Sequence, residues 1–174
     1  GVNAHAGKGN AFIIEADEYD NMFLGLKPQI EVVTSLEHDH PDIFPTLESM
    51  YVSFEKFVDL IPDDGTLIVC AEDAGATALI PHARKKGINI VAYYIQNEMT
   101  ISSPYWVMAR AVKANQRGGF DFVVSSNLGP TGSDSVEVSL QVPGKHNVRN
   151  ALAVVAIVEL LGLSKDKAAA ALSK

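Results

Sequence analysis

The sequence has a single cysteine, Cys70, so no disulfide can form within the chain. A lone thiol is typical of proteins in reducing compartments, and we therefore expect a cytoplasmic protein. Long apolar runs are also lacking. The longest strongly apolar stretch, residues 151–163, contains Glu159 and is too short to span a bilayer. We find no signal-peptide pattern and expect no membrane partner.

Positive charge is scarce as well. The 174 residues include 14 Lys and Arg against 21 Asp and Glu, a formal net charge of −7. Nucleic acids and anionic membranes would repel such a chain, which argues against both as general partners. A small phosphate ligand held by a few local groups and a metal ion remains compatible with this charge. The first residue is Gly1, not Met, and we expect a chain excised from a longer protein.

The apolar pattern predicts an α/β fold. Buried strands are expected first, alternating with helices, and then three strands joined by turns. This order predicts a three-layer sandwich with a mainly parallel sheet, extended by an antiparallel meander. We expect strands at 11–16, 30–35, 66–70, 88–94, 105–114, 120–126 and 136–142, and helices at 46–61, 74–86, 147–161 and a last one capped by Ser164. Thr46 is expected to cap the helix that follows it.

Polar clusters follow the first two expected strands. The run EADEYD (15–20) begins with Glu15, and carboxylates at a strand end suit Mg²⁺, although a solvated acidic turn is the alternative. The run HDHPD (38–42) contains two imidazoles and two carboxylates. A metal-dependent hydrolase using His38, His40 and Asp42 is one interpretation, and a polar loop is another. Glu15 and His40 would face one ligand if their strands are neighbours.

Two further segments contain candidate anion-binding groups. The glycine-rich start, residues 1–9, superficially resembles a phosphate-binding P-loop. Its spacing is wrong, however, and Gly9 stands where Ser or Thr would bind Mg²⁺, so we reject Lys8 as a P-loop lysine. Polar residues also gather at the start of the apolar helix after Gly144. Helix N-termini favour anions, although Asn147 could instead simply cap the helix.

Three stretches together resemble the central domain of the Mur ligases, the ATP-dependent amide ligases of peptidoglycan precursor synthesis. They are EADEYD (15–20), LKPQIEVVTSLEHDH (26–40) and GKHNVRNALAVVAIVELLGL (144–163). Their order and spacing agree with the family, and the resemblance spans nearly the whole chain. The absence of an insertion between the first two stretches favours the members that join L-alanine to UDP-N-acetylmuramate.

The resemblance implies a mechanism and a set of site residues. ATP would phosphorylate the lactyl carboxylate of UDP-N-acetylmuramate, and the amino group of L-alanine would attack the acyl phosphate. Glu15 would hold Mg²⁺ between the ATP phosphates, and His40 would hold a second Mg²⁺ near the acyl phosphate. The residues implied at the nucleotide are His146, Asn147, Arg149 and Asn150, with Asn150 near the adenine. Asn3 would lie near the sugar substrate.

The resemblance also implies that residues 1–174 are a truncated middle domain. The N-terminal UDP-binding domain, the P-loop segment and the C-terminal domain would be absent. We therefore expect the chain alone to bind Mg·ATP weakly at most and not to ligate. Two alternatives are a recycling ligase that uses a preformed tripeptide and a non-catalytic remnant that binds a nucleotide or a partner protein. Folylpolyglutamate synthases share the fold but match the flanking motifs less well.

Overall fold

The computed structural model describes residues 4–96, 103–129 and 135–174. In these residues, six strands form one sheet in the order β1-β2-β3-β4-β5-β6. The first four strands run parallel to one another, and β5 and β6 continue the sheet antiparallel. The strands are β1 (Ile30–Val33), β2 (Thr66–Cys70), β3 (Asn89–Ile95), β4 (Tyr105–Ala114), β5 (Phe120–Ser126) and β6 (Val136–Ser139).

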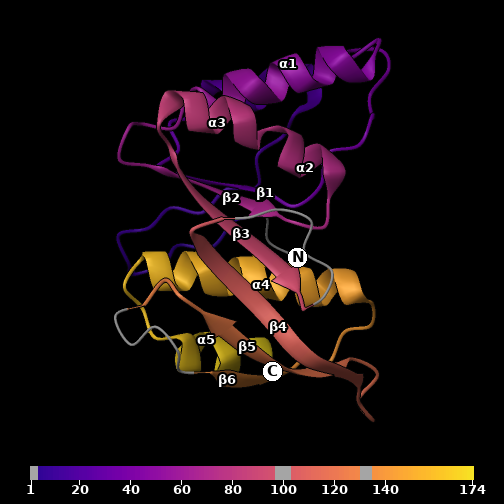
Figure 1. The fold of residues 1–174 in the computed structure, drawn as a ribbon, viewed down its shortest axis with the longest axis vertical. Coiled ribbons are helices and arrows are strands. Elements are labelled where there is room, and N and C mark those ends of the chain that lie inside the picture. The colour runs from indigo at the N-terminus through magenta and orange to yellow at the C-terminus, as the bar shows by residue number, and fades with distance from the viewer. Residues whose placement is uncertain (1–3, 97–102, 130–134) are drawn as a thin grey trace.

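Helices cover both faces of this sheet (Figure 1). One face carries α1 (Leu47–Val58), α2 (Ala74–Ala78) and α3 (Ile80–Lys86), and the other carries α4 (Lys145–Leu160) and α5 (Lys165–Leu172). Each layer has its own apolar core. Leu67 and Val69 of β2 pack toward α1 and α3, whereas Ile68 and Cys70 pack toward α4. The expected three-layer α/β sandwich with an antiparallel extension is therefore confirmed.

Local sequence signals explain most of the element boundaries. Thr46 caps α1 as expected, since its hydroxyl accepts from the Ser49 amide at 3.2 Å. In turn the Thr46 amide donates to the Ser49 hydroxyl. The helix at 74–86, which we expect to break or restart at Pro81, is divided into α2 and α3. Pro81 lies in the first turn of α3, where its missing N–H costs nothing. Strand β6 is shorter than the expected 136–142.

One expected strand is wrong. Residues 11–16 form no strand, and the side chains of Phe12, Ile13 and Ile14 are 87%, 78% and 52% exposed. A strand needs a neighbouring strand and a covered face. In the described residues β1 pairs only with β2, and no element covers the apolar side chains of this segment.

The acidic run is instead anchored by a short 3-10 helix, η1 (Tyr19–Gly25). Phe23 of η1 is buried, and its ring lies 4.5 Å from that of Phe57 and 5.2 Å from that of Phe54, both on α1. This apolar contact fixes residues 17–25 beside the loop that follows β1. No helix in the described part of the chain is both long and apolar enough to cross a membrane.

Candidate nucleotide-binding site

The carboxyl ends of β1, β2 and β3 meet at one edge of the sheet, where α4 also begins. A cavity of about 440 Å³ lies there. Three of the residues implied at the nucleotide line it, namely His146, Arg149 and Asn150. Its other walls come from the strands and the segments that follow them, including Ser35, Glu37, Cys70, Glu72 and Tyr93. This is the edge at which ligands bind in open α/β sheets.

Gly144 sets the start of α4. Its φ of +93° lies in the region that favours glycine, and a Cβ there would lie 2.3 Å from an imidazole atom of His146. The helix begins at Lys145, two residues earlier than expected. The alternative in which Asn147 simply caps the helix is excluded, because Gly144 is the N-cap residue. The Asn147 side-chain amide donates instead to the Pro143 carbonyl at 2.6 Å, which holds the turn into the helix.

Arg149 points to a carboxylate in the wall of the cavity. Its Nε donates to Glu72 Oε2 at 2.5 Å, and its Nη2 also pairs with that oxygen. The other oxygen, Glu72 Oε1, accepts from the Ile95 amide at 2.6 Å. The Glu72 side chain is 7% exposed, so this ion pair is largely shielded from solvent. It connects the segment after β2, the end of β3 and the first turns of α4.

The two polar runs expected at the strand ends also lie side by side. His40 Nε2 lies 3.2 Å from Glu18 Oε1, and the Tyr19 hydroxyl donates to Asp42 Oδ2 at 2.9 Å. The Tyr19 and His40 rings meet edge to face, with centroids 5.1 Å apart. His40 has a φ of +51°, a left-handed conformation that costs energy for a residue with a side chain. The contacts with η1 hold it in place.

The structure does not assemble a metal centre from these residues. Glu15 is exposed, and no group of three or more His, Cys, Asp or Glu side chains within the described ranges is arranged to hold a metal ion. His38 Nε2 bonds to the Phe44 carbonyl at 2.7 Å, while His40 and Asp42 bond to Glu18 and Tyr19. The hydrolase set is thus divided among three different partners. Asn3 lies outside the described residues.

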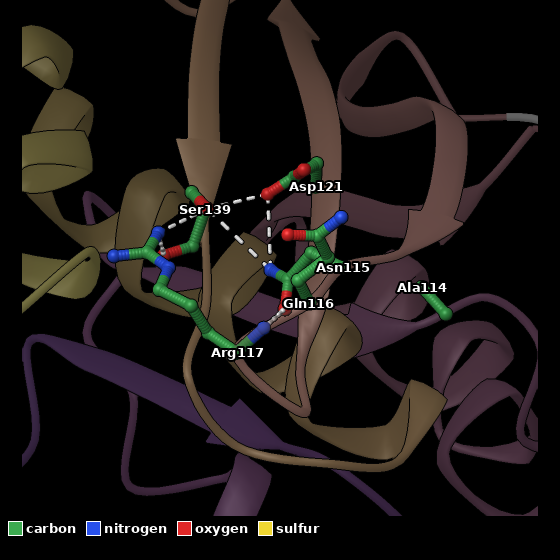
Figure 2. A pocket seen from close by; sticks show the side chains of 6 residues that line it. All are labelled: Ala114, Asn115, Gln116, Arg117, Asp121 and Ser139. Atoms are coloured by element: carbon green, nitrogen blue, oxygen red, sulfur yellow. Dashed lines mark hydrogen bonds between the residues drawn. The ribbon is translucent and has the colours of Figure 1, made fainter.

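A second, more open cavity of about 610 Å³ lies at the β4–β5 turn, and its polar groups hold the turn together. Figure 2 shows Asn115 at its centre, donating to Asp121 at 3.0 Å, while Arg117 reaches Ser139. The Asn115 side-chain oxygen also accepts from the amides of Arg117 and Gly119, each at 3.0 Å. The Ser139 hydroxyl also donates to Asp121, and the hydrogen bonds that Asp121 accepts from Ser139 and Asn115 lower the pKa of its carboxyl. The network accounts for the turn without a ligand.

Comparison with known proteins decides the family. The family model described as Mur ligase middle domain matches residues 3–158. This chain belongs to the Mur ligase family. It is 38% identical over 173 residues to UDP-N-acetylmuramate–L-alanine ligase of Renibacterium salmoninarum, and 39% identical over 173 residues to the enzyme of the same name from Arthrobacter sp.. Both alignments cover 99% of this chain and 34% of the relative, so this Mur ligase domain spans about a third of those proteins.

Solved structures agree with this assignment. A protein from Neisseria meningitides, named UDP-N-acetylmuramate:L-alanyl-gamma-D-glutamyl-meso-diaminopimelate ligase, superposes with a TM-score of 0.70 at 25% identity. That match covers 91% of this chain and 46% of the other. MurF from Acinetobacter baumannii superposes with a TM-score of 0.66 at 20% identity, which supports the fold alone. The resemblance read from the three sequence stretches is therefore confirmed at the level of the family.

Several residues that line the cavity of this Mur ligase domain were missed in the sequence, Glu72 and Tyr93 among them. Glu72 lies two residues after the end of β2, at the same sheet edge as the polar runs that were recognised. The rule that drew attention to Glu15 and His40, polar residues after a buried strand, applies equally to Glu72. Tyr93 gave no such signal, because it lies inside the apolar strand β3 and reads as a core residue.

Proposed function

We propose that this chain is the ATP- and Mg²⁺-binding middle domain of a ligase that joins L-alanine to UDP-N-acetylmuramate. The observation that carries the proposal is the cavity at the start of α4, lined by His146, Arg149 and Asn150. These are residues that the family resemblance places at the nucleotide. The names of the relatives at 38% and 39% identity support the choice of substrates. The UDP-binding and amino-acid-binding parts would belong to other domains of a longer protein.

The polar groups around the cavity suit a nucleotide. Helix α4 has 16 residues and starts beside the cavity, so the positive end of its dipole favours a phosphate near its N-terminus. Asn150 is exposed at the rim and offers an amide, which can both donate to and accept from the edge of a purine. Asn147, implied by the resemblance as a nucleotide contact, uses its side-chain amide in the turn before α4. We therefore propose His146 and Asn150 as the direct contacts with the nucleotide.

Glu15 and His40 remain the proposed Mg²⁺ ligands. Mg²⁺ usually keeps several waters and takes one or two protein groups together with phosphate oxygens, so it needs no complete protein cage. Glu18 beside His40 Nε2 fits the pattern in which a carboxylate orients a metal-binding imidazole. The bound ion would neutralise phosphate charge, which is the main requirement of phosphoryl transfer. A single reduced thiol supports a cytoplasmic location for this chemistry.

Ligand-observed NMR on the 174-residue chain tests the proposal. ATP with Mg²⁺ should bind weakly, with the adenine protons in contact with the protein, and Asn150→Ala should weaken binding at least about fivefold, the value of one lost hydrogen bond. Gln116→Ala is the matched control. It removes an exposed amide from the cavity at the β4–β5 turn and should leave binding unchanged. A wild-type chain that binds no adenine nucleotide, or a loss confined to Gln116→Ala, would overturn the proposal.

A second candidate is a recycling ligase that takes a preformed peptide. The likeness to the Neisseria protein, whose name contains a tripeptide, supports this alternative. The longer gene product would distinguish the two. In the presence of ATP and UDP-N-acetylmuramate, phosphate release with L-alanine supports the first candidate. Phosphate release with the tripeptide but not with L-alanine supports the second. The isolated chain should release phosphate with neither amine.

A further inference from the structure

A hydrogen bond between two exposed side chains ties the acidic run to the histidine run. The Tyr19 hydroxyl donates to Asp42 Oδ2 at 2.9 Å, and the two residues are 23 positions apart in the sequence. Tyr19 begins η1, whereas Asp42 lies in the turn that directly follows His40. The bond therefore joins the two segments right beside the His40 side chain.

The Tyr19 ring connects this bond to the His40 imidazole. The two rings meet edge to face at 83°, with their centroids 5.1 Å apart. Aromatic rings attract one another in this geometry. The Tyr19 hydroxyl is held by Asp42 while its ring lies against His40, so Tyr19 forms one side of the space that the imidazole occupies. Rotation of the imidazole toward that side is thereby restricted.

Glu18 holds the same imidazole by one of its ring nitrogens. Glu18 Oε1 lies 3.2 Å from His40 Nε2. An ionised carboxylate can only accept a hydrogen bond, so in this pair Nε2 carries the proton. A neutral imidazole then has its lone pair on Nδ1, which is the nitrogen that can bind a metal. The orientation of the ring decides where this lone pair points.

The main chain of the turn is held separately from the ring. The His40 carbonyl accepts from the amides of Ile43 and Phe44 at 2.9 Å and 2.8 Å, which supports the left-handed φ of +51° at His40. These bonds fix the backbone, but they leave several staggered rotamers open to the side chain. Contacts to the ring select one rotamer, and Tyr19 and Glu18 supply such contacts.

We propose that Tyr19 and Asp42 are positioning residues, whose hydrogen bond holds the His40 imidazole in the orientation that presents Nδ1 to a Mg²⁺ ion. The proposal rests on the proposed function, because it assumes that His40 is a metal ligand. Neither Tyr19 nor Asp42 touches the ion, and both act through the imidazole.

Tyr19→Phe tests the proposal, because it removes the hydroxyl and keeps the ring. The 174-residue chain with ATP is titrated with Mn²⁺, a paramagnetic substitute for Mg²⁺ with similar ligand preferences, and broadening of the His40 ring signals in NMR spectra gives its apparent affinity. We expect Tyr19→Phe to weaken that affinity about tenfold, the lower end of the range for losing an outer partner of a metal ligand. Without metal, the chemical shifts of the His40 ring protons should change, because the neighbouring ring is no longer fixed. The melting temperature should change little, since both side chains are exposed.

Two variants of Asp42 separate positioning from direct metal binding. Asp42→Ala removes the acceptor and should reproduce the effect of Tyr19→Phe, and the double variant should lose no more affinity than either single variant. Asp42→Asn keeps a side-chain oxygen that can accept from the Tyr19 hydroxyl, so it should restore affinity and His40 shifts close to those of wild type. A tenfold loss of Mn²⁺ affinity in Asp42→Asn with unchanged His40 shifts would make Asp42 a metal ligand itself and overturn the proposal.

Tyr105→Phe is the matched control. Tyr105 is 44% exposed, against 41% for Tyr19, and it begins β4 at the sheet edge opposite the cavity. This variant should keep the wild-type Mn²⁺ affinity and His40 shifts. Unchanged Mn²⁺ affinity in Tyr19→Phe would overturn the proposal while leaving the metal site in place. A wild-type chain whose His40 signals stay sharp with ATP and Mn²⁺ would overturn His40 as a metal ligand, and the positioning roles with it.

Discussion

Arg149 and Glu72 are 77 residues apart in the sequence, yet Arg149 Nε donates to Glu72 Oε2 at 2.5 Å in the wall of the cavity. The pair joins α4 to the segment after β2. Glu72 also accepts from the Ile95 amide, so the same carboxylate fixes the end of β3. One side chain thereby aligns three elements that together form the cavity wall.

Removing Arg149 should destabilise the domain more than changing Glu72. Arg149→Met leaves a carboxylate that is only 7% exposed without its guanidinium. Because Arg149 itself stays partly exposed, we expect a loss of about 2 kcal/mol in the free energy of unfolding, below the ~3–5 kcal/mol typical of a fully buried pair. Glu72→Gln keeps an oxygen for the Ile95 amide and should cost less. Urea unfolding followed by circular dichroism measures both.

A double-mutant cycle separates the pair from its surroundings. The variant that carries both Arg149→Met and Glu72→Gln should recover part of the loss, because no unpaired carboxylate remains. Arg110→Met, which removes an exposed arginine from β4, is the control and should change stability by less than about 0.5 kcal/mol. Strictly additive losses in the double variant would show that the two side chains do not interact.

Gly144 should tolerate no side chain. Its φ is +93°, and a Cβ would lie 2.3 Å from the His146 ring. We expect Gly144→Ala to lower the free energy of unfolding by about 1–3 kcal/mol and to weaken nucleotide binding by moving His146. Gly87→Ala is the control, because Gly87 also has a positive φ, +80°, but nothing lies within 4 Å of the added methyl. It should cost about 1–2 kcal/mol and leave binding intact. Equal loss of nucleotide binding in both variants would contradict this role of Gly144.

The exposed apolar residues Phe12 and Ile13 should make the isolated chain associate with itself. They lie in a segment without regular structure, and among the described residues β1 pairs on one side only. Exposed apolar side chains and an open strand edge both favour pairing with another chain. We expect the weight-average mass in analytical ultracentrifugation to rise with concentration, and Ile13→Lys to reduce that rise. Val142→Lys changes an exposed apolar residue in another segment and serves as the control. A mass that stays monomeric at all concentrations would refute this prediction.

The elements that could be predicted from the sequence are those that carry their own signals. The helix after Thr46 combines a capping residue with a continuous apolar face, and the structure places both as expected. The segment 11–16 shows where this reasoning fails. Its apolar composition indicates burial, but burial also needs a partner strand, and composition contains no information about whether the partner is present.

The residues of the candidate nucleotide-binding site could likewise be predicted only in part. His146, Arg149 and Asn150 gather at one cavity because they follow one another on α4. Glu72 joins them only through the parallel pairing of β1, β2 and β3, which no local pattern specifies. Asn147 shows that residue type alone does not fix a role, since a residue type that often caps helices instead donates to the Pro143 carbonyl before the helix.

A buried carboxyl on β1 provides a prediction about pH. Glu31 is 2% exposed, and neither carboxyl oxygen has a hydrogen-bond partner in the described residues. Burial raises its pKa from the ordinary value of 4.5 to about 9, against the opposing effect of Lys86. Lys86 itself donates to main-chain carbonyls, including that of Ile61 at 2.8 Å. Glu31 is therefore protonated in the folded protein near neutral pH.

The sign of the pH dependence follows from that protonation. Between pH 4.5 and about 9 the folded state holds a proton that the unfolded state releases. The contribution of protonated Glu31 to the free energy of unfolding is complete below pH 4.5. Above that pH it falls by about 1.4 kcal/mol per pH unit, until it is lost as the pH rises through about 9. Glu31→Gln cannot ionise, so its urea midpoint should decline less steeply between pH 5 and pH 9. Glu137→Gln, which changes an exposed glutamate on β6, should keep the wild-type slope. If Glu31→Gln and wild type decline in parallel, Glu31 is ionised in the folded protein and the prediction fails.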